Sequence, residues 1–200
     1  IYAMDIAKQY INNKTAKHVL VIGSESMSRA VDWTDRSTCV LFGDGAGAVV
    51  LSASDRVGIM EVVLHSSFDT EGFLTYPNQV VDGKKSTIGM RGNDVFKVAV
   101  TSMSSVVDQV LEKCNLQKSD IDWLVPHQAN IRIITAIAKK LDLPMSRVIV
   151  TIGNQGNTSA ASIPLALDYS IRNKQIQRGE VLLLESFGAG MTWGAMVVRY

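Results

Sequence analysis

The chain has 200 residues, of which 46% are hydrophobic and 20% are charged, as in ordinary globular proteins. A chain of this length can bury a substantial core in one or two domains. Its formal net charge is +1, so no overall field favours nucleic acid as a partner. Its apolar runs are far shorter than the roughly 20 residues that a membrane-spanning helix needs, and no signal peptide is recognisable. These properties argue against a disordered, nucleic-acid-binding or membrane protein.

The two cysteines are Cys39 and Cys114, and their spacing fits neither a disulfide framework nor a metal site. We therefore expect reduced thiols in a cytoplasmic protein without a bound metal. Cys39 lies in an apolar run, and Cys114 ends an amphipathic segment. Neither stands just before a helix, where the helix dipole would favour a thiolate. The sequence therefore offers no nucleophilic cysteine.

Hydrophobic periodicity predicts alternating helices and strands. The expected helices are residues 1–11, 93–114, 130–141 and 158–172, with Asn93 capping the second and Pro164 kinking the fourth. The expected strands are residues 18–23, 38–42, 48–52, 58–67, 122–125, 148–150, 181–185 and 193–200. Residues 24–37 and 69–89 are expected to be loops. The glycine-rich stretch 43–47 is expected to turn strand 38–42 back onto an antiparallel partner, 48–52.

This alternation predicts an α/β protein in which helices cover a mixed sheet whose strands are buried on both faces. The two ends of the chain share a pattern of helix, apolar strand, glycine-rich turn and second strand. We therefore expect two similar halves, residues 1–54 and 55–200. The chain begins with Ile1 inside a predicted helix, so we expect that the first half lacks its start.

His127 follows an apolar run that ends at Pro126, and it precedes a predicted helix. Ligands usually bind at the carboxyl ends of strands in an α/β sheet. A neutral imidazole can donate one hydrogen bond to an oxyanion or a thioester carbonyl. A histidine satisfied by neighbouring backbone is the more common case in general, but the motif from Val125 to Asn130 favours a functional role.

Two further segments could supply hydrogen-bond donors. Asn157, at the start of a predicted helix, could cap that helix or donate its amide to a developing enolate, and spacing alone does not decide between them. Ala189, within Gly188–Gly190, could expose a backbone N–H, although a simple tight turn is the more ordinary interpretation. Basic residues near these segments either form a solvated face or dock an acidic carrier or a phosphate-bearing substrate.

Four stretches of the sequence closely resemble beta-ketoacyl-acyl carrier protein synthase III. They are Trp123–Asn130, Gly156–Ser162, Phe187–Gly194 and the segment from Asp35 to Ala48. The resemblance covers the whole chain in consistent order. It implies a thiolase-like layered αβαβα fold, of which this chain holds the complete C-terminal half and the end of the N-terminal half. It also implies a homodimer.

The resemblance further implies a decarboxylative Claisen condensation that initiates fatty acid biosynthesis. In that family a cysteine takes the primer from acyl-CoA. Malonyl-acyl carrier protein then loses carbon dioxide, and its carbanion attacks the acyl-enzyme. Coenzyme A enters as a substrate thioester, and no cofactor is implied. The family's cysteine lies a few residues before the position of Ile1, so the chain itself would lack its nucleophile.

Roles for individual residues also follow from the resemblance. His127 and Asn157 would be catalytic and would hold the malonyl thioester carbonyl, and the backbone N–H of Ala189 would belong to the oxyanion hole. Coenzyme A and its pantetheine arm would contact Arg36, Asn93 and Asn130. The acidic carrier protein would contact Gln128, Arg132 and Lys97.

Two other functions stay open. Because the nucleophile is absent, the chain could be a non-catalytic fragment that binds carrier protein or coenzyme A, or that only dimerises. It could also belong to another thiolase-fold synthase, of the polyketide or hydroxymethylglutaryl type, although the residues from His127 to Asn130 argue against this.

Overall fold

The computed structural model describes residues 1–77, 79–81 and 83–200. The α-helices are α1 (Tyr2–Asn12), α2 (Gly92–Cys114), α3 (Ile131–Lys140), α4 (Ile152–Gln155) and α5 (Ser162–Arg172). The longer strands are β1 (His18–Ser26), β2 (Asp44–Ser52), β3 (Ile59–Ser66), β8 (Trp123–Pro126), β9 (Val181–Gly188) and β10 (Thr192–Arg199). Short strands are β4 (Leu74–Thr75), β5 (Val80–Val81), β6 (Lys84–Lys85) and β7 (Gly89–Met90). The 3-10 helices are η1 (Met27–Arg29), η2 (Lys118–Asp120), η3 (Met145–Arg147) and η4 (Ser159–Ala161).

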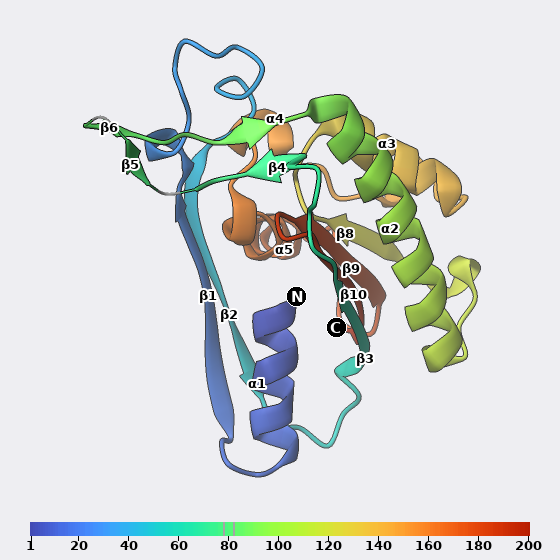
Figure 1. The fold of residues 1–200 in the computed structure, drawn as a ribbon. Coiled ribbons are helices and arrows are strands. Elements are labelled where there is room, and N and C mark those ends of the chain that lie inside the picture. Colours follow the sequence, from blue (N-terminus) through green and yellow to red (C-terminus); the bar gives the residue numbers. More distant parts are fainter. Residues whose placement is uncertain (78, 82) are drawn as a thin grey trace.

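A mixed four-stranded sheet forms the centre of the molecule, in the order β3-β10-β9-β8 (Figure 1). β8 and β9 are parallel, and the other neighbours are antiparallel. The predicted strand 148–150 is present only as one parallel bridge between Val148 and Leu124. The predicted mixed α/β sheet is therefore confirmed, with one strand fewer at its edge.

Successive side chains of β9 pack into two different cores, because a strand directs alternate residues to opposite faces. Leu183 packs with α2 and α3 on one face, in a cluster that includes Val107 and Ile137. Leu182 and Leu184 pack on the other face in a cluster that includes residues of α5. Burial on both faces explains why this strand is one continuous apolar run in the sequence.

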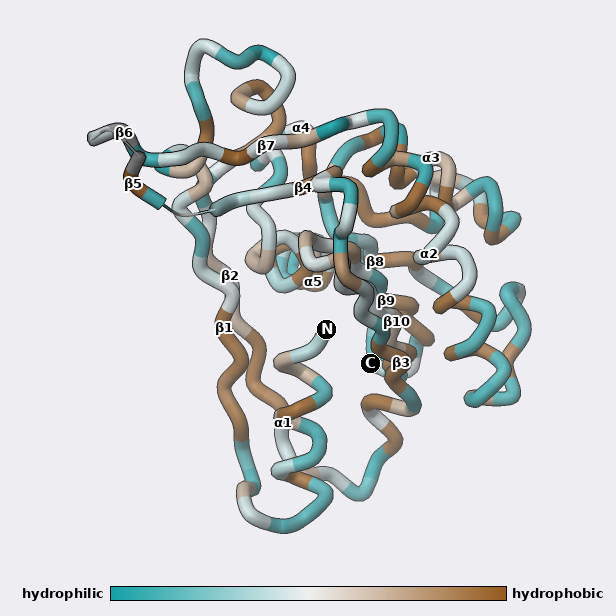
Figure 2. Tube along the Cα trace, viewed as in Figure 1, coloured by the Kyte–Doolittle hydropathy of each residue, from teal (hydrophilic) through white to brown (hydrophobic). Residues whose placement is uncertain are grey.

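A long two-stranded ribbon, β1 and β2, lies on the far side of α1 and α5 from the sheet (Figure 1). The order of layers is therefore ribbon, helices α1 and α5, sheet, and helices α2 and α3. Apolar residues run along much of the ribbon (Figure 2). One of its faces is open, with Leu20, Ile22 and Val50 exposed by 59%, 62% and 64%. The prediction that strand 18–23 is buried on both faces is therefore wrong for this structure.

The glycines of residues 43–47 do not form the predicted turn. Thr38 to Leu41 form turns rather than a strand, and β2 pairs with β1 instead. A Cβ added at Gly45 would lie 2.9 Å from Thr158 Cγ2, and one added at Gly47 would lie 3.0 Å from the ring of Pro164. The absence of side chains therefore lets the ribbon cross closely over the start of α5.

The helix boundaries also differ from the prediction. α2 begins after Arg91, and no side chain caps it, so the expected cap at Asn93 is wrong. α5 begins at Ser162, which puts Pro164 in the first turn. N–H groups there have no partner within the helix, so the reason for a kink disappears. The loop 69–89 contains short strands, and its residues 78 and 82 lie outside the described residues.

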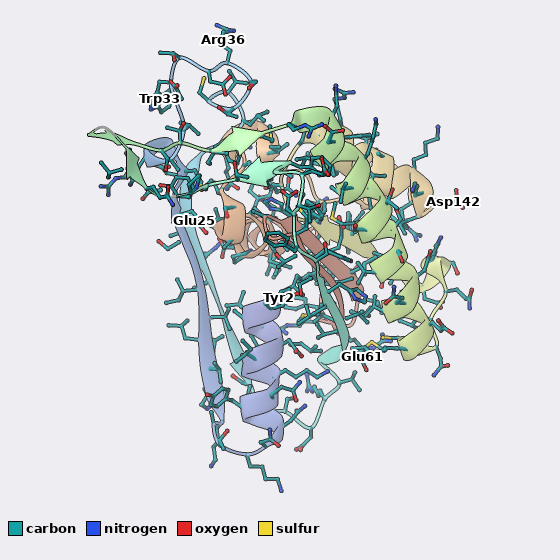
Figure 3. All side chains as sticks on the ribbon, in the orientation of Figure 1. Tyr2, Glu25, Trp33, Arg36, Glu61 and Asp142 are labelled. Atoms are coloured by element: carbon teal, nitrogen blue, oxygen red, sulfur yellow. The ribbon has the colours of Figure 1, made fainter. Side chains whose placement is uncertain are left out.

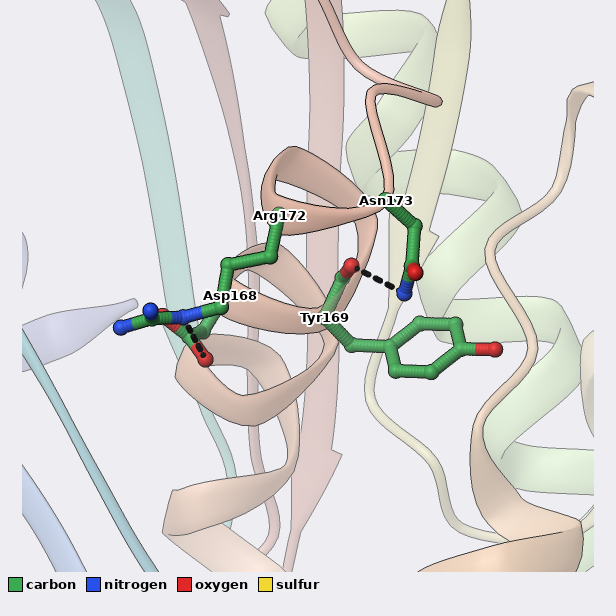
Figure 4. A network of polar contacts seen from close by, with 4 residues as sticks. All are labelled: Asp168, Tyr169, Arg172 and Asn173. Atoms are coloured by element: carbon green, nitrogen blue, oxygen red, sulfur yellow. Dashed lines mark hydrogen bonds and ion pairs between the residues drawn. The ribbon is translucent and has the colours of Figure 1, made fainter.

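The C-terminal end of α5 is closed by local polar contacts (Figure 4). Arg172 Nε donates to Asp168 Oδ1 at 2.7 Å, and Asn173 Nδ2 donates to the carbonyl of Tyr169 at 2.8 Å. The ion pair is exposed, so it contributes only about 0.3–0.5 kcal/mol. The amide contact satisfies one of the carbonyls that a helix end leaves free.

Three expectations from composition can be compared with the described part of the chain. Within it, no helix is both long and apolar enough to cross a membrane. The same residues contain no cluster of side chains that could hold a metal ion. Cys39 and Cys114 are free thiols, as predicted.

Close packing at Gly23 can be tested by adding one methyl group. A Cβ at this position would overlap the carbonyl oxygen of Ala160. We expect Gly23→Ala to lower the free energy of unfolding by about 1–3 kcal/mol, as overpacking does. The matched control is Gly58→Ala, because nothing lies within 4 Å of its added Cβ. Urea denaturation measures both, and equal effects of the two substitutions would contradict this account.

Candidate active site

His127 lies immediately after β8, where the sheet meets the start of α5. Its backbone N–H donates to the carbonyl of Glu185 at 2.8 Å, which extends the β8–β9 pairing by one residue. Its ring Nδ1 lies 2.6 Å from Ser162 Oγ. Backbone and ring are thus fixed by β9 and α5, which leaves Nε2 as the nitrogen with no partner among the described residues.

His127 is neutral at pH 7. Burial in the interior disfavours the charged imidazolium and lowers the pKa of His127 to about 4. A neutral imidazole has one N–H donor and one acceptor nitrogen. The ring can therefore donate a hydrogen bond without delivering a proton.

Asn157 lies in the segment between α4 and η4, and both its backbone and its side chain are fixed. Its N–H donates to the carbonyl of Leu41 at 2.9 Å, and its carbonyl accepts from Gly43 N at 2.9 Å. Its side-chain Oδ1 accepts from Ser159 N at 2.9 Å. This amide oxygen closes a local turn, and it is not a helix cap, because neither η4 nor α5 has a side-chain cap. The amide nitrogen has no partner among the described residues, so it is free to donate to a ligand.

Unusual backbone geometry lets this segment approach β1 and β2. A Cβ at Gly43 would overlap the carbonyl of Gln155. Gly156 has φ of +68° and Ser159 has φ of +50°, a region that glycine adopts more easily than other residues. The Ser159 hydroxyl also donates to Glu25 Oε1 at 3.2 Å. Glycine contacts and one side-chain bond therefore hold the Asn157 segment against residues far away in the sequence.

A cavity of about 760 Å³ brings many of the candidate residues together. The candidate residues that line it are His127, Asn157, Ala189, Asn93, Asn130 and Arg132. Apolar residues form much of the remaining wall, among them Phe96, Ala99 and Phe187. A few polar groups that converge in a largely apolar cavity are typical of a ligand site.

Ala189 and Asn130 occupy structured positions in this wall. Ala189 lies in the turn between β9 and β10, where its carbonyl accepts from the Thr192 hydroxyl at 3.3 Å. Asn130 is the N-cap of α3, and its Oδ1 accepts from Arg132 N at 2.8 Å. Asn130 therefore starts the helix and lines the cavity at the same time.

Gln128 cannot contact a partner protein, contrary to the expectation from sequence. It is 1% exposed. Its Nε2 donates to the carbonyls of Pro126 at 2.9 Å and Ile149 at 3.1 Å. Its Oε1 accepts from the backbone N–H groups of Thr151 at 2.8 Å and Ile152 at 3.1 Å. The buried side chain thus connects the His127 segment to the start of α4 through hydrogen bonds.

Two other predicted contact residues lie outside the cavity. Arg36 is at the tip of a loop and points away from the body of the molecule (Figure 3), and Lys97 is exposed on α2. Neither lines the cavity. Arg132 lines it, with its guanidinium 5.6 Å from the centre of the Phe96 ring, a cation–π distance.

Neither cysteine lies in the cavity wall. Burial, and then the charge of Glu61, raise the pKa of the Cys114 thiol, which disfavours a thiolate. Among the described residues, the wall of this cavity therefore contains hydrogen-bond donors but no thiol.

The sequence interpretation missed two residues beside His127, Ser162 and Glu185. Ser162 contacts the ring as described above. Glu185 accepts the backbone N–H of His127, yet its own carboxyl is fully buried and has no hydrogen-bond partner among the described residues. Burial raises the pKa of Glu185 to about 8, so the group is neutral at pH 7. The position of this glutamate in an apolar run of the sequence could have indicated a buried carboxyl with a raised pKa.

The raised pKa of Glu185 predicts a dependence of stability on pH. Between pH 4.5 and 8 the unfolded chain loses this proton and the folded chain keeps it. Stability should therefore fall as pH rises, by up to roughly 1.4 kcal/mol per pH unit. Glu185→Gln removes this contribution, so the variant should gain stability over the parent from pH 5 to pH 8. Urea titrations measure it, with the exposed Glu112→Gln as control. A difference that stays constant across pH would contradict the prediction.

Comparison with known proteins places these features in a family. The chain is 55% identical to beta-ketoacyl-(acyl-carrier-protein) synthase III of Methylococcus capsulatus, over 100% of this chain and 64% of the relative. It is 57% identical to the corresponding protein of Actinobacillus pleuropneumoniae, again over 100% of this chain and 64% of the relative. The crystal structure of 3-oxoacyl-(acyl-carrier-protein) synthase III from Aquifex aeolicus superposes with a TM-score of 0.94 at 47% identity, and covers 100% of this chain and 63% of that one.

The structural match confirms the thiolase-like layered fold expected from the sequence. The chain spans somewhat under two thirds of the length of these relatives. Two family models match it in separate segments. The model of 3-oxoacyl-(acyl-carrier-protein) synthase III matches residues 1–67, and the model of its C-terminal part matches residues 111–200. The chain therefore belongs to the 3-oxoacyl-(acyl-carrier-protein) synthase III family.

Proposed function

We propose that this chain is part of an enzyme that condenses an acyl-CoA primer with malonyl-acyl carrier protein and so initiates fatty acid biosynthesis. The observation that carries this proposal is the shared cavity of His127 and Asn157. In each residue, an internal hydrogen bond occupies one end of the polar group and leaves the other end free. The names of the relatives support the same reaction.

In the proposed reaction, the malonyl thioester oxygen accepts hydrogen bonds from His127 Nε2 and Asn157 Nδ2. The carbon–carbon bond to the malonyl carboxylate breaks, and carbon dioxide leaves. The electron pair of that bond moves into the thioester and forms an enolate. The negative charge gathers on the oxygen between the two donors. Fixed donors of this kind are worth about 3–4 kcal/mol each.

The neutral state of His127 suits this step. A charged imidazolium could protonate the new carbanion and end the reaction. A neutral N–H stabilises the enolate oxygen and keeps its proton. The carbanion then attacks the acyl carbonyl, the acyl–sulfur bond breaks, and the sulfur leaves as a thiolate. We propose that the backbone N–H of Ala189 donates a hydrogen bond to the oxyanion that forms in this second step.

Polar and basic residues in and around the cavity suit the arms of the two substrates. Asn93 and Asn130 line the cavity, which suits contacts with a pantetheine arm. Arg132 and Lys97 are exposed cations on α3 and α2, two helices that pack against each other, and they suit an acidic carrier protein. Arg36 would contact coenzyme A only in a conformation or assembly that brings its loop to the substrate.

The family resemblance supports further proposals about the whole protein. We propose that the whole protein is a homodimer in the cytoplasm. We also propose that this chain divides into two parts, residues 1–54 and 55–200. The pairing of strands supports this division, because β1 and β2 form one sheet and β3 joins another. A non-catalytic fragment is the alternative, since the described chain presents no thiol at the cavity.

Removing either donor tests the proposed reaction. In a protein extended to the full length of the relatives, His127→Ala and Asn157→Ala should each lower malonyl decarboxylation by about 10²–10³-fold. Transfer of the primer from acyl-CoA should change much less, because that step does not form the malonyl enolate. Radiolabelled carbon dioxide release measures decarboxylation, and His18→Ala at an exposed site is the control. Decarboxylation at the parent rate in both variants would refute the assignment.

Charge reversal tests the carrier-protein surface. Arg132→Glu should raise KM for malonyl-acyl carrier protein roughly tenfold at low salt, with little change in kcat, because rim charges act mainly on association. The effect should shrink as salt screens the charges. Lys17→Glu makes the same charge change at an exposed position outside the cavity wall. Equal effects of the two substitutions would show that net charge, not this surface, is responsible.

A further inference from the structure

We propose that Ser162 selects the tautomer of His127 that carries its proton on Nε2, and that Ser162 is therefore a positioning residue for the proposed condensation. The inference rests on the proposed function for its catalytic meaning. The tautomer itself can be measured independently of any activity.

The Ser162 hydroxyl stands between two partners in the interior. Ser162 is 1% exposed. Its Oγ lies 2.6 Å from His127 Nδ1 and accepts from the backbone N–H of Gln128 at 3.3 Å. A backbone N–H can only donate, so this contact uses one lone pair of Oγ. The hydroxyl keeps one proton and one further lone pair.

Two arrangements of protons are then possible. In the first, Ser162 O–H donates to Nδ1, and the imidazole proton resides on Nε2. In the second, Nδ1–H donates to Oγ, and the hydroxyl proton must find another acceptor. Among the described residues, Nδ1 is the only acceptor that a hydrogen bond joins to this hydroxyl. The second arrangement leaves a buried donor unpaired, which is unfavourable, so the structure assigns the first.

The position of the Ser162 hydroxyl is itself fixed from both sides. Ser162 is the first residue of α5, directly after η4 and the segment that holds Asn157. Gln128 cannot shift easily, because its side chain forms hydrogen bonds with residues 126, 149, 151 and 152. The geometry that sets the tautomer therefore depends on the packing of α5 against the end of β8.

The tautomer decides what His127 presents to a ligand. With the proton on Nε2, the ring offers a donor to the thioester oxygen. With the proton on Nδ1, it would offer a lone pair, which repels an oxygen that becomes negative. Ser162 thus acts through His127 and needs no contact with the substrate.

Nitrogen-15 NMR of histidine-labelled protein at full length tests the assignment. In the parent at pH 7, His127 Nε2 should show the signature of a protonated nitrogen and Nδ1 that of an unprotonated one. Ser162→Ala should weaken this preference and lower malonyl decarboxylation by roughly 10–100-fold, as loss of a residue that orients a functional imidazole does. Ser162→Thr keeps a hydroxyl and should stay within about threefold of the parent.

The possible outcomes separate this inference from the proposed function. A proton on Nδ1 in the parent overturns the inference, whether or not the alanine variant folds. Ser162→Ala with unchanged tautomer and unchanged decarboxylation also overturns it. Transfer of primer from acyl-CoA should stay within about threefold in both variants. If His127→Ala leaves decarboxylation intact, the proposed function fails, and the NMR result still decides the tautomer.

Discussion

The site depends on a short backbone contact between segments that are distant in the sequence. Leu41 and Gly43 exchange hydrogen bonds with Asn157, and the missing side chain of Gly43 lets the two backbones approach. A second contact, from His127 to Glu185, ties the histidine to the sheet. The first contact fixes the backbone of Asn157 next to the start of β2, and the bond from Ser159 to Glu25 supports the same segment. Without the second, His127 would be a loop residue rather than an extension of β8.

The side chains of His127 and Asn157, the two proposed donors, are oriented in the same way. Each side chain has an end that could accept a hydrogen bond, and an internal donor occupies that end. Ser159 N–H binds the oxygen of Asn157, and we assign the Ser162 hydroxyl the same role at Nδ1 of His127. What remains free in each case is an N–H group. Donors that are oriented before the substrate arrives need no reorganisation when charge develops, which is the main source of electrostatic catalysis.

Burial drives both ionisable groups at the end of the sheet to their neutral forms. It lowers the pKa of His127 and raises the pKa of Glu185, because the charged form of either group is poorly solvated there. At pH 7 neither contributes a formal charge. In the proposed reaction the only charge that develops at this position is therefore that of the enolate, which two neutral donors face.

The sequence by itself determined the features that depend on local pattern. The apolar run of β9 and the periodicity of α2 and α3 predicted a sheet with covered faces, and the segment around His127 predicted a site at the end of a strand. Tertiary structure decided what each surface packs against. The stretch 43–47 was predicted to be a turn because a local window of sequence cannot show how closely Gly45 and Gly47 approach residues 158–165. Gln128 was predicted to be accessible because its backbone partners Thr151 and Ile152, at the start of α4, are distant from it in the sequence. Ser162 became significant only when α5 met β8, since a hydrogen bond depends on distance in space and not on separation in the chain.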